Sequence, residues 1–298
     1  MIKILELFGG IGAPRKALIN LGVNIKAIDY VEIDEKAVKS YNALFDNDYG
    51  IQDVRGYNLR PDILIHGSPC QSFSIAGKQA GADEGSGTES SLMWETINII
   101  KQMGTWKPRV IVWENVKNVL SKHMVHNFNR YLTEMEKLGY KNSFEILNSM
   151  DFGLPQNRNR VFTVSRLDKE FDFRKMKKCK LRDINEFIEK EVDDSYIVTQ
   201  PSILRAIGKK GIIARAPIIN DFCYTITERQ DRLPNAGLVY LGNDIYRFLS
   251  ERECWRLQGF DDEDFEKVSK VNSRRALYKQ AGNTIPVTIL ESLFDALL

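Results

Sequence analysis

The chain has 298 residues, of which 43% are hydrophobic and 28% are charged, and its net charge is +2. This suits a cytoplasmic globular protein with one large and one smaller domain, because no signal peptide and no membrane-spanning run is visible. The small net charge neither requires nor excludes a nucleic-acid partner, and four scattered cysteines without a C-x-x-C pair argue against disulfides and a structural metal site.

The first 165 residues alternate between strand-like and helix-like patterns. Such alternation predicts an α/β fold whose mostly parallel sheet is covered by helices on both faces. In chain order we expect strands at 2–8, 25–31, 63–66, 110–113, 144–147 and 160–165, with a further strand before Asp53. The expected helices are 14–22, 35–44, 90–103 and 128–138.

The pattern changes after Leu167. Short β-like runs and Gly, Pro and Asn turns replace the regular alternation, which predicts a smaller, irregular, β-containing domain. Residues 285–298 are apolar at helical spacing, so we expect a last helix that packs on the large domain. We therefore assign 1–167 and 272–298 to the large domain and 168–271 to the small one.

The turn Phe8-Gly9-Gly10-Ile11-Gly12 follows the first predicted strand. Glycines at this position let a ligand approach the backbone at a helix N-terminus. Glu32, at the end of the second predicted strand, is suited to ribose hydroxyls, and Asp53 could face an adenine amino group. The alternative is that Glu32 and Asp34 are only helix-capping acids. Together these residues predict a nucleoside-bearing cofactor at the carboxyl ends of the strands.

Polar residues also follow the two central strands. Cys70 comes after strand 63–66 in a polar turn, and Glu114 comes at the end of the next strand. Arg158 and Arg160 would point to one side of an extended segment. A thiol, a carboxyl and a guanidinium on adjacent strand ends predict a covalent-catalysis site, although Cys70 by itself is better interpreted as an inert loop cysteine.

Five segments together resemble the DNA cytosine-5 methyltransferase family, in family order and across nearly the whole chain. They are Pro69-Cys70-Gln71, Glu114-Asn115-Val116, Gln156-x-Arg158-x-Arg160, Arg252 to Phe260 and Gln280 to Val287. The resemblance implies a Rossmann-like methyltransferase domain that binds S-adenosyl-L-methionine, and a small target-recognition domain. It also implies double-stranded DNA as the partner of a monomeric enzyme in a bacterial or phage-infected cell.

The resemblance assigns roles to single residues. Cys70 would attack C6 of cytosine, Glu114 would bind N3 and the amino group, and Arg160 would contact O2 with support from Arg158. The target base would be flipped out of the duplex, beneath a loop formed by residues 72–90. The implied cofactor contacts are Phe8, Gly10, Gly12, Glu32, Asp53, Leu92, Asn283 and Thr284.

DNA contacts are expected from the catalytic loop and the small domain. Thr225-Ile226-Thr227 resembles the short threonine element of the family, and the arginines and glutamine that follow have side chains suited to base edges. A hairpin turn with solvated charges is an equally good interpretation of each. The predicted contacts are Gln71, Ser74, Thr225, Arg229, Gln230 and Arg232.

Two other functions compete with DNA methylation. A tRNA cytosine methyltransferase on the same fold usually carries a Cys-Phe-Thr stretch, and Cys223-Tyr224-Thr225 is close to it. A DNA-binding regulator without activity is the other alternative, and the intact Cys70, Glu114 and Arg160 argue against it. Two departures from the family pattern are Glu6, where an aspartate is usual, and Glu89 in the predicted loop, where relatives often have an arginine nearby.

Overall fold

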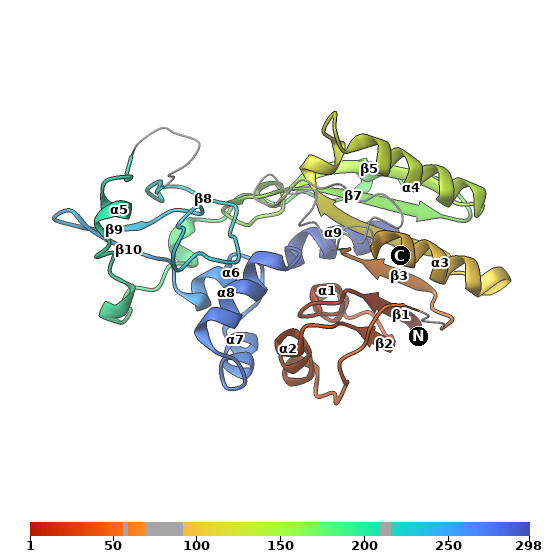
Figure 1. Ribbon diagram of the computed structural model, residues 1–298, viewed down its shortest axis with the longest axis horizontal. Helices are drawn as coiled ribbons and strands as arrows, with labels where there is room; N and C mark the ends of the chain where they lie inside the picture. The colour runs from red at the N-terminus through yellow and green to blue at the C-terminus, as the bar shows by residue number, and fades with distance from the viewer. Residues whose placement is uncertain (56–58, 69–91, 209–215) are drawn as a thin grey trace.

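The computed structural model describes residues 1–55, 59–68, 92–208 and 216–298. A six-stranded sheet in the order β2-β1-β3-β4-β7-β5 forms its centre (Figure 1). β7 is antiparallel to both of its neighbours, and the other pairs are parallel, which confirms the predicted α/β fold with a mostly parallel sheet. The strands are β1 (Ile2–Leu7), β2 (Ile25–Val31), β3 (Ile63–His66), β4 (Val110–Val116), β5 (Lys141–Asn148) and β7 (Asn159–Arg166).

Helices cover both faces of this sheet because each central strand is apolar on both sides. Ile4 packs with residues of helices α1 and α9 on one face, whereas Leu5 packs with α3 and α4 on the other. Helix α2 borders the β2 edge in Figure 1. The helices are α1 (Ala13–Asn20), α2 (Glu35–Phe45), α3 (Met93–Met103), α4 (Val125–Lys137) and α9 (Val287–Leu297).

The strand expected before Asp53 is wrong, since residues 46–55 contain no strand. Hydrogen bonds, including two from a side chain, hold this segment in place of strand pairing. The side chain of Asn42 bonds both the N–H and the carbonyl of Tyr49, at 3.0 and 2.9 Å, and the N–H of Gln52 donates to the carbonyl of Glu32 at 2.9 Å. The segment nevertheless lies beside the end of β2, which is what brings Asp53 near Glu32.

The region after β7 is built from short elements, as the sequence predicts. It has a small hydrophobic cluster of its own, formed by Val198, Ala206, Ala216, Leu238 and Phe248. Strand β8 (Cys223–Tyr224) pairs with β6 (Gln156–Asn157), and β9 (Val239–Gly242) pairs with β10 (Ile245–Arg247). The helices of this region are α5 (Pro201–Leu204), α6 (Glu251–Arg256), α7 (Asp262–Ser269) and α8 (Arg274–Asn283).

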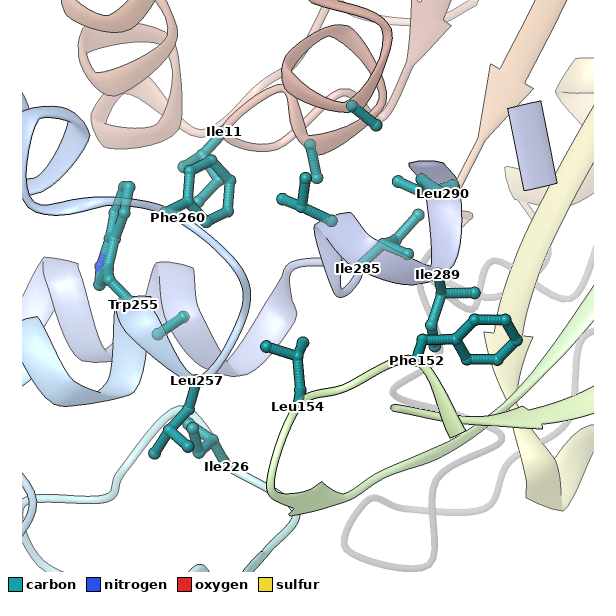
Figure 2. Packing of buried hydrophobic residues seen from close by; sticks show 14 of the residues in the cluster. Ile11, Phe152, Leu154, Ile226, Trp255, Leu257, Phe260, Ile285, Ile289 and Leu290 are labelled. Carbon is teal, nitrogen blue, oxygen red and sulfur yellow. The ribbon is translucent and has the colours of Figure 1, made fainter. Parts of the chain in front are cut away.

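One large hydrophobic cluster joins this region to the sheet. Trp255 and Phe260 belong to the same cluster as Ile11 after β1 and Ile285 and Ile289 around α9 (Figure 2). The division of the chain at residues 167 and 272 therefore stays a prediction, because the packing is continuous across it. Within the described ranges, no helix combines the length and apolarity needed to cross a membrane.

Candidate active site

The loop after β1 has an unusual backbone. Phe8 has a φ of +53°, a left-handed conformation that a bulky residue rarely adopts. Gly10 and Gly12 also have positive φ, at +53° and +77°, where glycine carries no steric penalty. These conformations turn the chain sharply from β1 into α1 and expose the loop backbone at the carboxyl edge of the sheet.

The glycines of this loop serve different purposes. No heavy atom of the described residues lies within 4 Å of the position that a Cβ on Gly10 would take, so the space beside Gly10 is open. A Cβ on Gly12 would lie 2.5 Å from the ring of Phe45 and 2.7 Å from Tyr41. The packing of α2 thus accounts for Gly12, which the family resemblance implied as a cofactor contact.

Glu32 lies at the end of β2 and holds backbone amides. Its Oε2 accepts from the N–H of Gly10 at 2.9 Å, and its Oε1 accepts from Ile33 and Asp34 at 2.8 and 2.9 Å. A carboxylate offers about four acceptor positions, so one remains for a ribose hydroxyl. Asp53 is exposed, and its Oδ1 accepts from the N–H of Arg55 at 3.0 Å.

A cleft at this edge brings several predicted site residues together. It is lined by residues from the loop after β1, from β4 and from the end of α8, namely Phe8, Gly10, Glu114, Asn283 and Thr284. Leu92, Glu32, Asp53 and Gly12 are not among its lining residues. The open glycine loop, the acids beside it and the amide of Asn283 fit the donor and acceptor groups of a nucleoside cofactor, so the predicted ligand matches the residues present.

Glu114 lines the cleft and forms an ion pair with Arg160. Nε of Arg160 lies 3.1 Å from Oε1 of Glu114, and their side chains are only 13% and 12% exposed. Burial raises the pKa of Glu114, and the positive charges of Arg160 and Arg158 oppose this rise. A carboxyl with a raised pKa can carry a proton and donate it to a ring nitrogen.

Arg158 is buried and its guanidinium binds backbone carbonyls from two other segments. Nη1 donates to Ile226 at 3.0 Å, and Nη2 donates to Gly282 and Thr284, both at 2.9 Å. Arg158 therefore ties the β6–β7 segment to the threonine element and to the end of α8. This placement indicates a positioning residue, whereas Arg160 is paired with Glu114, which lines the cleft.

The residues that follow β3 lie close to Glu114. A Cβ on Gly67 would lie 3.8 Å from Oε2 of Glu114, and Trp113 donates from Nε1 to Oγ of Ser68 at 3.0 Å. Buried His66 contacts the hydroxyl of Tyr131 at 3.0 Å, and burial lowers the pKa of His66 to about 3, so this ring is neutral. The predicted nucleophile Cys70, and Gln71 and Ser74, lie outside the described residues.

The predicted recognition residues differ in their surroundings. Arg229 and Arg232 are exposed, whereas the hydroxyl of Thr225 donates to the carbonyl of Asn157 at 2.9 Å. Gln230 is fully buried, and its amide bonds Gly237 and Ala236 at 3.3 and 3.2 Å. Gln230 therefore closes its own loop, which corrects our prediction of a base contact.

Sequence reasoning missed the support beneath the cofactor loop. Glu6 is 1% exposed and accepts from the hydroxyl of Tyr41 at 2.5 Å, and burial raises the pKa of Glu6 to about 7. The hydroxyl of Tyr30 donates to the carbonyl of Gly10 at 2.5 Å. Glu6 had a signal, since it departs from the usual aspartate, but the tyrosines look like ordinary core residues in the sequence.

Asn283 and Gly282 connect the cleft to the segment around Thr227 and Glu228. Nδ2 of Asn283 donates to Oε1 of Glu228 at 2.9 Å. A Cβ on Gly282 would lie 2.5 Å from the backbone of Thr227 and Glu228. The end of α8 and the threonine element thus meet backbone to backbone beside the cofactor cleft.

Comparisons with known proteins agree with this geometry. The family described as "C-5 cytosine-specific DNA methylase" matches residues 2–298. The type II methyltransferase M2.ScrFI of Lactococcus lactis subsp. cremoris is 30% identical, over all of this chain and 99% of its own length. The orphan methyltransferase M.SPRI of Bacillus phage SPR is 25% identical over all of this chain and 97% of its own length.

Solved structures show the same fold at lower identity. The Dnmt2 methyltransferase of S. pombe superposes with a TM-score of 0.79 at 20% identity, covering all of this chain and 98% of that protein. The Entamoeba histolytica methyltransferase EhMeth has a TM-score of 0.80 at 19% identity, with coverage of 100% and 98%.

Proposed function

Because the chain belongs to the C-5 cytosine-specific DNA methylase family, whose methyl donor is S-adenosyl-L-methionine, we propose that it methylates C5 of a cytosine flipped out of duplex DNA. The observation that carries this proposal is the ion pair of Arg160 with Glu114, which lines the same cleft as Phe8 and Asn283. A proton donor and a guanidinium beside a nucleoside pocket are what activation of a cytosine ring requires.

Cytosine C5 is too weakly nucleophilic to accept a methyl group unaided. In the proposed reaction, the Cys70 thiolate forms a bond to C6, and N3 takes a proton from the Glu114 carboxyl. The guanidinium of Arg160 then stabilises the negative charge left on the Glu114 carboxylate, and it also binds O2 of the cytosine. Electron density moves to C5, which is now able to attack an electrophile.

S-adenosyl-L-methionine, when bound, supplies the electrophilic methyl group that C5 accepts. Phe8 would hold its adenine, Glu32 its ribose and Asp53 the adenine amino group, and Asn283 and Thr284 would close the pocket. Water then takes the C5 proton, and the electrons of that C–H bond form the C5–C6 double bond and expel the Cys70 thiolate, after which N3 returns its proton to Glu114. Cys70 ends as it began, so the chain turns over as a catalyst.

The exposed Arg229 and Arg232 would contact DNA from the small domain, and Thr225 would keep the threonine element against the β6–β7 segment. Arg158 would fix this element relative to Arg160, since it binds the Ile226 carbonyl from the same segment. We propose that the target is a short duplex site bound by one protein molecule, because the recognition region is small.

Transfer of labelled methyl groups tests the proposal. Unmethylated duplex DNA should be labelled at cytosine C5 by the wild type and not by Cys70→Ser. A duplex that carries 5-fluorocytosine should trap a covalent complex, because fluorine blocks the proton loss that releases Cys70. Label on tRNA and not on DNA, or DNA binding without any label, would contradict the proposal in favour of the two competing functions.

Bisulfite sequencing of the labelled DNA would then give the recognition site. The expected result is methylation at one short sequence, at the same cytosine in each copy. Methylation spread over unrelated cytosines would contradict a recognition role for the small domain.

A further inference from the structure

Tyr30 in β2 and Glu32 just after that strand bind the two backbone polar groups of Gly10. The hydroxyl of Tyr30 donates to the carbonyl of Gly10 at 2.5 Å, and Oε2 of Glu32 accepts from the N–H of Gly10 at 2.9 Å. Both bonds come from the carboxyl end of β2, where Glu32 directly follows Val31, the last residue of the strand. Two hydrogen bonds thus fix the loop after β1 at Gly10, its central glycine.

The ring of Tyr30 fixes how closely β2 approaches this loop. A Cβ on Gly9 would lie 2.6 Å from two ring carbons of Tyr30, so the bare backbone of Gly9 packs on the ring. The N–H of Gly9 also donates to the carbonyl of Val31 at 3.2 Å. Contact with the ring and a bond to the strand therefore hold two successive loop residues.

Tyr30 is itself rigid. Its ring stacks on that of Tyr41 with centroids 3.7 Å apart, both side chains are fully buried, and the hydroxyl of Tyr41 is anchored on Glu6. Burial and the nearby carboxylates, above all Glu32, raise the pKa of Tyr30 well above its ordinary value. Its hydroxyl therefore keeps its proton and remains a donor to Gly10.

We propose that Tyr30 is a positioning residue for S-adenosyl-L-methionine, acting through Gly9 and Gly10. The left-handed conformation of Phe8 is unfavourable and persists only if the surroundings hold it. Tyr30 supplies that restraint before any ligand arrives, so the ligand does not have to order the loop on binding. The inference rests on the proposed function, because it takes the cleft at Phe8 as the cofactor site.

The test compares Tyr30→Phe with Tyr140→Phe in the full chain. Tyr140 is a matched control, because it is 2% exposed and its hydroxyl donates to the carbonyl of Pro108 at 2.7 Å, in the cluster on the α3–α4 side of the sheet. Titration calorimetry with S-adenosyl-L-homocysteine, without DNA, gives the dissociation constant. Tyr30→Phe should raise it by about threefold to tenfold, the effect of one hydrogen bond, and Tyr140→Phe by less than twofold.

Stability and kinetics complete the test. Both variants should lower the urea midpoint by similar amounts, since each loses one buried hydrogen bond. In methyl transfer, Tyr30→Phe should raise KM for S-adenosyl-L-methionine and keep kcat within twofold. Equal dissociation constants for the two variants, or a lower kcat with unchanged affinity, would overturn the proposal.

Calorimetry also separates this inference from the proposed function. A wild type that binds S-adenosyl-L-homocysteine but transfers no methyl group to DNA would contradict the proposed function, and the Tyr30 result would still stand. A wild type that does not bind this ligand would overturn the role of Tyr30.

Discussion

Arg160 and Glu114 meet diagonally across the antiparallel pair β4 and β7, with 3.1 Å between Nε and Oε1. Arg160 is paired in register with Val116, and Glu114 stands two residues before Val116 on β4. Both side chains therefore leave the same face of the sheet, within reach of each other. The reversal of β7 creates this contact, because it brings the start of one strand beside the end of the other.

Replacing Glu114 with Gln should lower kcat by about 100-fold or more, because the amide cannot deliver a proton to N3. Steady-state methyl transfer to duplex DNA measures this. DNA affinity should fall by less than tenfold, since phosphate contacts supply most of it. Glu145→Gln, on the exposed side of neighbouring β5, should keep kcat within twofold. A Glu114→Gln variant with near-normal kcat would remove proton donation from the mechanism.

Glu6 should make stability depend on pH. Its pKa is raised by burial from 4.5 to about 7 in the folded chain, so folding favours the protonated carboxyl. The stability that Glu6 contributes is full below pH 4.5 and is lost as the pH rises through 7. Between pH 5 and pH 8 the wild type should lose about 2–3 kcal/mol of unfolding free energy relative to Glu6→Gln. Urea titrations at both pH values test this, and parallel losses in both proteins would contradict it.

Arg158→Lys should destabilise the fold by about 3 kcal/mol, since one ammonium cannot replace bonds to the carbonyls of Ile226, Gly282 and Thr284. Urea unfolding measures the loss. Arg174→Lys is the control, because the Arg174 side chain is 91% exposed and pairs only at the surface with Asp172. If Arg158→Lys is as stable as the control, Arg158 does not connect these segments.

Gly282→Ala should lower the free energy of unfolding by about 1–3 kcal/mol and weaken DNA binding, because its Cβ would meet the backbone of Thr227 and Glu228 at 2.5 Å. Gly50→Ala is the matched control, as the described structure places no heavy atom within 4 Å of a Cβ there. Unfolding and fluorescence anisotropy with labelled duplex measure both effects. Unchanged DNA affinity would show that the threonine element does not depend on this close approach.

The exposed arginines and the buried glutamine of the recognition segment should respond differently. Arg229→Gln and Arg232→Gln should each reduce the slope of log affinity against log salt concentration by about 1 if they neutralise a phosphate. Gln230→Ala should instead lower stability, because it removes the bonds to Gly237 and Ala236. An unchanged salt slope for both arginine variants would place the DNA on another surface.

Some of the site follows from local sequence. The periodicity of hydrophobic residues puts Phe8, Glu32 and Glu114 at the ends of predicted strands. The carboxyl ends of parallel strands lie at one edge of the sheet. That reasoning succeeded because each strand here is short and apolar and is followed by a polar turn. It failed before Asp53, where the bonds of Asn42 to Tyr49 replace a strand, because a side chain that competes with the backbone leaves no periodic signal.

Periodicity and the fixed spacing of motif residues were enough to predict the α/β class, most of the elements and the family. The burial of Gln230, the three carbonyls bound by Arg158 and the bond from Tyr30 to Gly10 became visible in the folded chain alone. The contacts of Arg158 and Tyr30 join segments far apart in the chain. Their geometry depends on how the sheet, α8 and the threonine element pack together, which no local pattern encodes.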